Sequence, residues 1–331
     1  MSYAIEISRA GGPEVLTKVE REAAQPGSGE ILIRNQAAAV NFIDTIIRAG
    51  EMPDGMMPDL PHVPGVEGAG IVEALGDGAE GFAIGDRVAW MGPIGAGGYG
   101  THSVIDTPYV TRIADGIDFA LAASIPVNAM TAYHMLVNLG GAAAGRSVLV
   151  HAAAGGVGTM IQHIAKHLGM TVIASVSTGK VGYARAQGAD HVIDYRTEDV
   201  AARVLEITDG RGVDLTLNPI SGETLKSDFA VLAPFGTAVI FGFLAGPPAG
   251  RFDEDFAKHF QKSVAVRLSD IYTYFGTRPA AFAADMAKVF GLLGDGVLRP
   301  QITTLPMAEA ADAHRRLSAG ETTGKIVLTI D

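Results

Sequence analysis

The chain has 331 residues, 48% of them hydrophobic, and a formal net charge of −11 at pH 7. This length allows two ordinary domains with buried cores, and the acidic balance argues against nucleic-acid binding, which needs a basic surface. Every apolar run is broken well before the ~20 residues of a spanning helix, and the N-terminus lacks the pattern of a signal peptide. We therefore expect a soluble cytoplasmic protein without membrane contacts.

The chain contains no cysteine. Disulfides, thiol nucleophiles and every zinc site that uses thiolate ligands are therefore excluded. The 42 glycines have no collagen-like period, so we interpret them as turns and close backbone approaches.

Short β-like segments separated by Gly and Pro fill the first third of the chain. This spacing predicts an irregular, mostly antiparallel, barrel-like domain. The expected strands are 3–8, 30–37, 68–74, 87–91 and 103–106.

From about Ser124 the pattern changes to alternating strands and helices. A strand at 147–151 leads through a glycine turn to an amphipathic helix at 157–168, and a β-branched strand at 171–176 follows. Further strands are expected at 191–195, 213–218, 237–242 and 263–268, and helices at 200–208 and 222–232. Such alternation predicts an α/β fold with a doubly wound parallel sheet of the Rossmann type. Beyond it we expect a helix at 280–294, a strand at 301–305, a short helix at 307–318 and a strand at 325–330.

The turn at 152–158 reads AAAGGVG and carries the clearest functional signal. In a dinucleotide fold one glycine lets the backbone approach the pyrophosphate and the next lets the helix pack on the strand. Gly155 and Gly158 fill these positions, with Gly156 and Val157 between them, while Ala153 replaces the first glycine. The alternative is a simple turn in a glycine-rich chain, but the flanking strands and helix favour nucleotide binding.

The residues after the second strand bear on the choice of nucleotide. NAD-preferring folds place a carboxylate there for the ribose hydroxyls, whereas this chain has Ser177 and Lys180. Tyr195 and Arg196 follow the next strand and can join the same pocket. The two cations can instead be solvated surface charges. Together these residues favour NADPH over NADH, because they suit a 2′-phosphate.

Several motifs, in this order, resemble the quinone oxidoreductase, or zeta-crystallin, branch of the zinc-free medium-chain dehydrogenase/reductase superfamily. Besides the glycine turn they are GGPEVL at 11–16, VNFID at 40–44, PGVEGAG at 64–70, GDRV at 85–88, TAY at 131–133, GAD at 188–190, DYR at 194–196 and GKIVL at 324–328.

The resemblance implies a GroES-like catalytic domain at 1–123, rejoined by 298–331. It implies a Rossmann NADPH-binding domain at 124–270, a connecting helix at 271–297 and an active site in the cleft. It also implies a homodimer that pairs through the strand at 263–268.

Relatives that use zinc bind it with cysteine and with the histidine of a Gly-His-Glu motif, and the corresponding triplet here is Gly65-Val66-Glu67. A site built from His62, Glu67 and Asp44 is chemically conceivable, but a loop histidine and structural carboxylates are the simpler interpretation. We expect no metal.

By resemblance, Asn41 and Asp44 are the catalytic residues at the nicotinamide end of the cleft. Asn41 would donate an amide hydrogen bond to cofactor or substrate, and Asp44 would orient its neighbours. The alternative is that this segment caps a helix, and both interpretations can hold together. The resemblance adds five cofactor contacts, of which the aromatic ones can equally be packing residues: Thr131, Tyr133, Phe241, Gly242 and Phe243.

Some positions depart from the family. Ile46 and Met52 stand where relatives often have tyrosines, which counts against the mechanism of the enoyl-thioester reductases, and with Met56 and Met57 they make the loop more apolar. Gly320 replaces an arginine of the cofactor contact.

We expect NADPH-dependent reduction of a quinone. The alternatives are reduction of the C=C bond of enals, enones or enoyl thioesters, and a non-catalytic NADPH-binding, crystallin-like protein.

Overall fold

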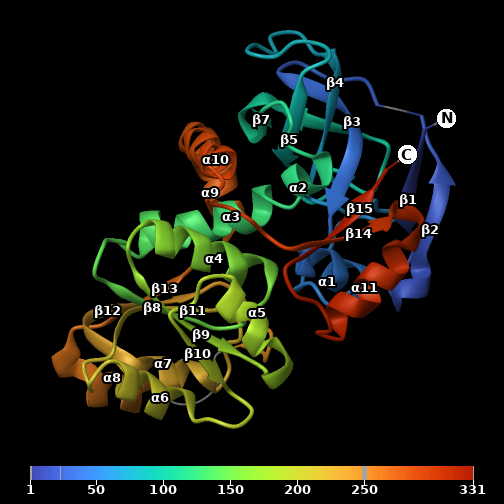
Figure 1. Ribbon diagram of the computed structural model, residues 1–331. Coiled ribbons are helices and arrows are strands. Elements are labelled where there is room, and N and C mark those ends of the chain that lie inside the picture. Colours follow the sequence, from blue (N-terminus) through green and yellow to red (C-terminus); the bar gives the residue numbers. More distant parts are fainter. Residues whose placement is uncertain (1, 23, 248–251, 331) are drawn as a thin grey trace. The chain divides into compact units, whose positions relative to one another are not determined.

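The structure is a computed structural model that describes residues 2–22, 24–247 and 252–330 (Figure 1). The chain divides into two compact units. Unit 1 comprises Met1–Met130, Tyr274–Asp295 and Pro300–Asp331, and unit 2 comprises Thr131–Thr273 and Gly296–Arg299. Both the first and the last part of the chain therefore belong to unit 1.

Unit 1 is built on a seven-stranded sheet in which β14, β15, β3, β4, β5 and β7 follow one another and β6 also pairs with β3. All pairs are antiparallel except β14 with β15. The strands are β3 (Glu30–Ala39), β4 (Glu67–Leu75), β5 (Arg87–Met91), β6 (His102–Asp106), β7 (Val110–Arg112), β14 (Ile302–Pro306) and β15 (Lys325–Thr329), and β1 (Tyr3–Ile7) pairs separately with β2 (Leu16–Glu20). The expected antiparallel, barrel-like character is confirmed.

Helices and short turns complete unit 1. They are η1 (Pro13–Val15), α1 (Phe42–Ala49), η2 (Thr107–Tyr109), α2 (Phe119–Ala123), α3 (Pro126–Tyr133), α9 (Ile271–Thr277), α10 (Pro279–Gly294), η6 (Met307–Glu309) and α11 (Ala310–Ser318), of which α3 and α9 extend into the residues of unit 2. The strands β2 and β7 were not expected from the sequence, and the connecting helix expected at 271–297 is divided into α9 and α10.

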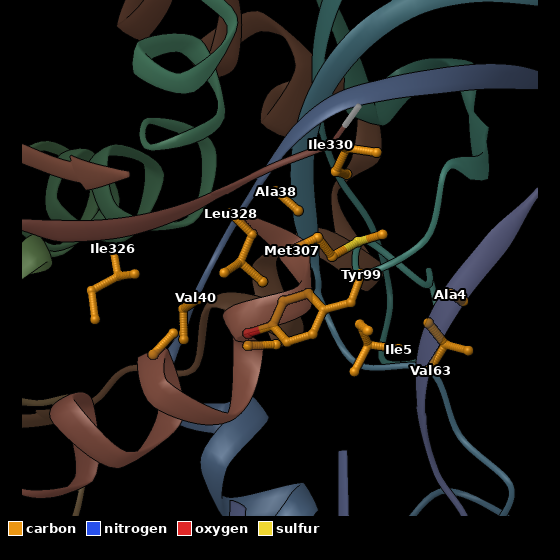
Figure 2. Packing of buried hydrophobic residues seen from close by; sticks show 12 residues of the cluster. Ala4, Ile5, Ala38, Val40, Val63, Tyr99, Met307, Ile326, Leu328 and Ile330 are labelled. Carbon is orange, nitrogen blue, oxygen red and sulfur yellow. The ribbon is translucent and has the colours of Figure 1, made fainter. Parts of the chain in front are cut away.

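One apolar core of unit 1 joins the two ends of the chain (Figure 2). Alternate residues of β15 share a face, so Ile326 and Leu328 point into this core together with Ile330 just beyond the strand. Tyr99 lies among them (Figure 2). The core thereby fixes β15, and with it Lys325, against β3 and α11.

Unit 2 is a six-stranded, wholly parallel sheet in the order β10-β9-β8-β11-β12-β13. Its strands are β8 (Ser147–Val150), β9 (Thr171–Val176), β10 (His191–Asp194), β11 (Val213–Asn218), β12 (Leu232–Ile240) and β13 (Ala265–Leu268). Helices α4 (Gly156–His167) and α5 (Val181–Ala186) lie on one face, and α6 (Val200–Ile207), α7 (Thr224–Val231) and α8 (Phe252–His259) lie on the other (Figure 1). This strand order is that of the Rossmann fold, which confirms the expected class.

Some boundaries differ from the sequence-based expectations. β12 begins at Leu232, whereas the strand was expected at 237–242 and Leu232 was expected to be the last residue of a helix. A register shift in its pairing with β11 accompanies this earlier start. β13 begins at Ala265, since Ser263 has a left-handed backbone with φ of 52°. An unexpected π-helix, η3 (His134–Leu139), continues α3, and 3₁₀ turns lie at η4 (Thr178–Lys180) and η5 (Phe260–Lys262).

Candidate functional site

The glycine turn between β8 and α4 brings the helix close to the strand. A Cβ on Gly158 would lie 2.6 Å from the Cα of Ala153, so this glycine is needed for the helix to approach the strand. Gly155 has an ordinary φ of −79°, and a Cβ there would meet only the carbonyl of Ala152, at 3.4 Å. The protein's own packing therefore does not demand glycine at 155. An approaching phosphate would explain it, and the helix N-terminus there offers unpaired N–H groups.

The ends of β9 and β10 bring the four proposed phosphate-binding residues close together. The amide of Tyr195 donates to the carbonyl of Val176 at 3.1 Å, which sets the residues after β10 beside Ser177. Lys180 is half-buried at the end of η4, and this burial lowers the pKa of its ammonium. The guanidinium of Arg196 lies 5.6 Å from the ring centroid of the exposed Tyr195.

Asp194, which the sequence reasoning missed, connects these two loops. Its carboxylate accepts hydrogen bonds from the Thr178 hydroxyl and, at 3.0 Å, from the amide of Arg196. These contacts, the Thr178 hydroxyl first, lower the pKa of Asp194 below its usual value. The carboxylate is thus engaged within the protein.

The segment after β12 packs against the segment after β11. The amides of Phe241 and Leu244 donate to the carbonyls of Asn218 and Pro219, at 3.1 and 3.0 Å. A Cβ on Gly242 would lie 3.0 Å from the carbonyl oxygen of Pro219, so the two segments approach closely there. Phe243 follows with 54% of its surface exposed. Thr131 and Tyr133 lie at the end of α3, directly before the π-helix, a rare structure that often marks functional sites.

A buried polar network that was not predicted joins the carboxyl ends of β8 and β11. His151 Nε2 lies 2.8 Å from Asp228 Oδ1, and Asn218 Nδ2 lies 2.6 Å from Asp228 Oδ2. Asn218 Oδ1 in turn accepts from the amides of Ile220 and Ser221. The order of a Rossmann sheet reverses between these two strands, and ligands bind at that point.

In unit 1, Asn41 belongs to a buried cluster with Glu67 and Lys325. The ammonium of Lys325 lies 2.8 Å from Glu67 Oε1 and 2.6 Å from Asn41 Oδ1. Asn41 Nδ2 donates to Glu67 Oε1 at 2.8 Å. The three residues are 6%, 0% and 4% exposed, so this ion pair is shielded from water. No local sequence signal distinguishes Lys325 from a surface lysine.

Asp44 caps α1 and is wholly buried. Its carboxylate accepts from the amides of Asn41 and Gly65, at 2.8 and 3.1 Å, and from the Tyr99 hydroxyl at 3.3 Å. Burial raises the pKa of Asp44 to about 6 in spite of these bonds. Asp44 thus has the capping role considered as an alternative. Its partner Gly65 lies two residues before Glu67, the partner of Asn41.

Tyr99 links Asp44 to a second buried group, His314 on α11. The Tyr99 hydroxyl lies 3.0 Å from His314 Nε2. Burial lowers the pKa of His314 to about 3 and raises that of Tyr99 well above its usual value, so both are neutral near pH 7. If Tyr99 donates to Asp44, the proton of the neutral imidazole belongs on Nε2.

Two of the three residues considered for a metal, Glu67 and Asp44, have the side-chain contacts described above, and the backbone of the third, His62, pairs with that of Ile7. Across residues 2–22, 24–247 and 252–330, no group of three His, Cys, Asp or Glu side chains is arranged to hold a metal ion.

No helix in these ranges has the length and apolarity to cross a membrane.

The apolar loop after α1 divides into inward and outward side chains. Met52 packs against the core residues Ile7, Val15 and Ile47, so it fills the interior. Phe42 and Met56 are 45% and 58% exposed and offer apolar surface beside Asn41 and in the loop. Ile46, which was expected in this loop, lies within α1, and of the other three, Met52, Met56 and Met57, Met56 is the most exposed.

Comparison with known proteins places these features in a family. Residues 27–115 match the alcohol dehydrogenase GroES-like domain, and residues 187–328 match a domain described as zinc-binding dehydrogenase. The chain is 39% identical to a quinone oxidoreductase of Pseudomonas aeruginosa and 34% identical to a 2-haloacrylate reductase of a Burkholderia species, each over 99% of both chains. It is also similar to the structure of Escherichia coli quinone oxidoreductase complexed with NADPH, with a TM-score of 0.89, 31% identity and coverage of 99% and 100% of the two chains. The chain is thus an oxidoreductase that belongs to the quinone oxidoreductase branch of the medium-chain dehydrogenase/reductase superfamily.

Proposed function

We propose that this protein uses NADPH to reduce a quinone, without zinc. The observation that carries the proposal is the 39% identity to a quinone oxidoreductase over 99% of the chain. The similarity to a quinone oxidoreductase whose structure contains NADPH supports the choice of cofactor. The lack of cysteine and the valine in Gly65-Val66-Glu67 support chemistry without zinc.

Unit 2 would bind the cofactor. Gly155, Gly156, Val157 and Gly158 would hold the pyrophosphate at the N-terminus of α4. Positive charge and hydroxyls after β9 and β10 would bind the 2′-phosphate, through Ser177, Lys180, Tyr195 and Arg196. The end of α3 and the segment after β12 would contact the rest of the cofactor, through Thr131, Tyr133, Phe241, Gly242 and Phe243.

Bound NADPH would supply the hydride, so the residues of unit 1 need only orient the reactants and stabilise charge on the substrate oxygen. Asn41 is proposed to donate an amide hydrogen bond to nicotinamide or substrate. Asp44 holds the backbone of Asn41 in place through the 2.8 Å bond to its amide. The exposed Phe42 and Met56 give apolar surface that suits a flat conjugated substrate.

The second candidate is reduction of the C=C bond of enals or enones, which the 34% identity to a 2-haloacrylate reductase favours. NADPH oxidation should be followed with 1,4-benzoquinone, 9,10-phenanthrenequinone, 2-alkenals and a crotonyl thioester. We expect the highest kcat/KM with a quinone. Preference for alkenals over every quinone would replace the proposal, and NADPH binding without turnover of any acceptor would indicate the non-catalytic alternative.

We also propose a homodimer that pairs through β13, in the cytoplasm. β13 is the last strand of its sheet, and all four of its residues are exposed. Leu268, Phe235 and Phe260 are more than two-thirds exposed around this edge, at 71%, 77% and 81%. Light scattering should report a dimer that Leu268→Asp converts to a monomer, whereas Ile84→Asp, at an equally exposed site of unit 1, should leave it intact. A monomeric starting protein would contradict this arrangement.

A further inference from the structure

The side-chain amide of Asn41 has a single chemically consistent orientation. The group beside one end, the ammonium of Lys325, can only donate hydrogen bonds, and it lies at 2.6 Å. The group beside the other end, the carboxylate of Glu67, can only accept, and it lies at 2.8 Å. A reversed amide would set donor against donor and acceptor against acceptor. Lys325 and Glu67 therefore fix the direction of Asn41.

Lys325 and Glu67 are themselves held from two more directions. Lys325 also contacts Asn128 Oδ1 at 3.3 Å, so its three N–H groups have three acceptors. The second oxygen of Glu67 accepts from the amide of Val127 at 2.7 Å. The pair thus ties β15 and β4 to the start of α3, and it has no freedom to turn toward solvent.

Stability alone is a weak reason for such an arrangement. A buried ion pair loses hydration that its attraction barely repays, and apolar replacements are often as stable or more stable. The geometry offers a different role. A cation on the oxygen of an amide strengthens its N–H groups as donors, because hydrogen bonds in a chain polarise one another. One Nδ2 hydrogen of Asn41 serves Glu67, and the other has only a long contact of 3.4 Å to the carbonyl of Ala39.

We infer that Lys325 and Glu67 are positioning residues that act in hydride transfer through Asn41, by aiming and polarising its second N–H group. The inference rests on the proposed function, in which that N–H group meets nicotinamide or substrate. It assigns a role to Lys325, the residue at the opposite end of the chain from Asn41.

The test removes both charges together, because a single change would leave one buried charge unpaired. The variants are Lys325→Met with Glu67→Gln, Asn41→Ala, and the combination of all three, with Lys288→Met at an exposed ion pair as control. We expect the charge-free pair to keep its Tm and to lose about 10- to 100-fold in the single-turnover rate of hydride transfer to 1,4-benzoquinone. Asn41→Ala should lose a similar factor, and the triple variant should lose no more than either. The inference would be overturned if the rate losses of the charge-free pair and of Asn41→Ala were fully additive in the triple variant, or if the charge-free pair kept the wild-type rate.

Two further measurements keep the test decisive. Lys325→Arg retains the charge but changes the direction of its donors, so it should fold normally and still transfer hydride slowly; a wild-type rate there overturns the inference even if the charge-free pair does not fold. The carboxamide NMR signals of Asn41, identified by their loss in Asn41→Ala, should shift when the charges are removed, and unchanged signals would count against the inference. Failure of the wild-type protein to reduce any acceptor would refute the proposed function instead, since the NMR result does not depend on turnover.

Discussion

The carboxylate of Asp228, on α7, accepts a hydrogen bond from His151 Nε2, which follows β8, at 2.8 Å. Asp228 is fully buried and also binds the amide of Asn218. One side chain thus holds together the ends of the two strands between which the sheet order reverses. The position of the glycine turn relative to the segment after β11 depends on this contact.

Asp228→Leu should therefore destabilise the protein. It leaves two buried donors, on His151 and Asn218, without acceptors, at a cost of about 2 to 4 kcal/mol. Asp228→Asn should cost about 1 kcal/mol, because an imidazole can carry its proton on Nδ1 and accept from the new amide on Nε2. Urea denaturation of the two variants measures the difference, and equal losses would mean that the network contributes little.

Gly155 and Gly158 of the turn should respond differently to alanine. Gly158→Ala places a Cβ 2.6 Å from Ala153 Cα and should cost about 1 to 3 kcal/mol of stability. Gly155→Ala meets only an ordinary contact at 3.4 Å, so Tm should barely change, while the Kd for NADPH rises about tenfold or more. Thermal unfolding and fluorescence titration separate the two effects. Unchanged NADPH affinity in Gly155→Ala would place the pyrophosphate elsewhere.

The proposed 2′-phosphate site predicts a change in cofactor preference. Lys180→Ala removes a half-buried cation and should raise the Kd for NADPH by about 10- to 100-fold with little effect on NADH. Lys226→Ala, which breaks an exposed ion pair on α7, is the control and should leave both constants unchanged. Equal weakening of NADPH and NADH by Lys180→Ala would contradict the assignment.

Much of the Rossmann unit was predictable because its signals are local. Strand 213–218 follows a glycine and alternates apolar with polar residues, and β11 has the expected bounds. The networks were not predictable, since their members are distant in sequence: Lys325 meets Asn41 across 284 positions, and Asp228 meets His151 across 77. A buried lysine and a surface lysine look alike until the fold supplies the partner carboxylate. The π-helix after α3 also has no local pattern that separates it from an α-helix.

Asp44 predicts a specific dependence of stability on pH. Burial raises the pKa of its carboxyl to about 6 in the folded protein, against about 4 in the unfolded chain. Between these values the folded protein holds a proton that the unfolded chain has released, so the contribution of Asp44 is complete below the unfolded pKa and is lost as pH rises through about 6. Asp44→Asn cannot titrate and therefore lacks this contribution.

The difference in the free energy of unfolding between wild type and Asp44→Asn isolates this group, because the other titrating groups are common to both proteins. From about pH 5 to about pH 7.5 the wild type should lose about 1 kcal/mol of its free energy of unfolding relative to Asp44→Asn. Urea denaturation at several pH values measures it. A constant difference would show that Asp44 is already ionised at the lower pH, which would mean that its bonds to Asn41, Gly65 and Tyr99 outweigh the loss of hydration.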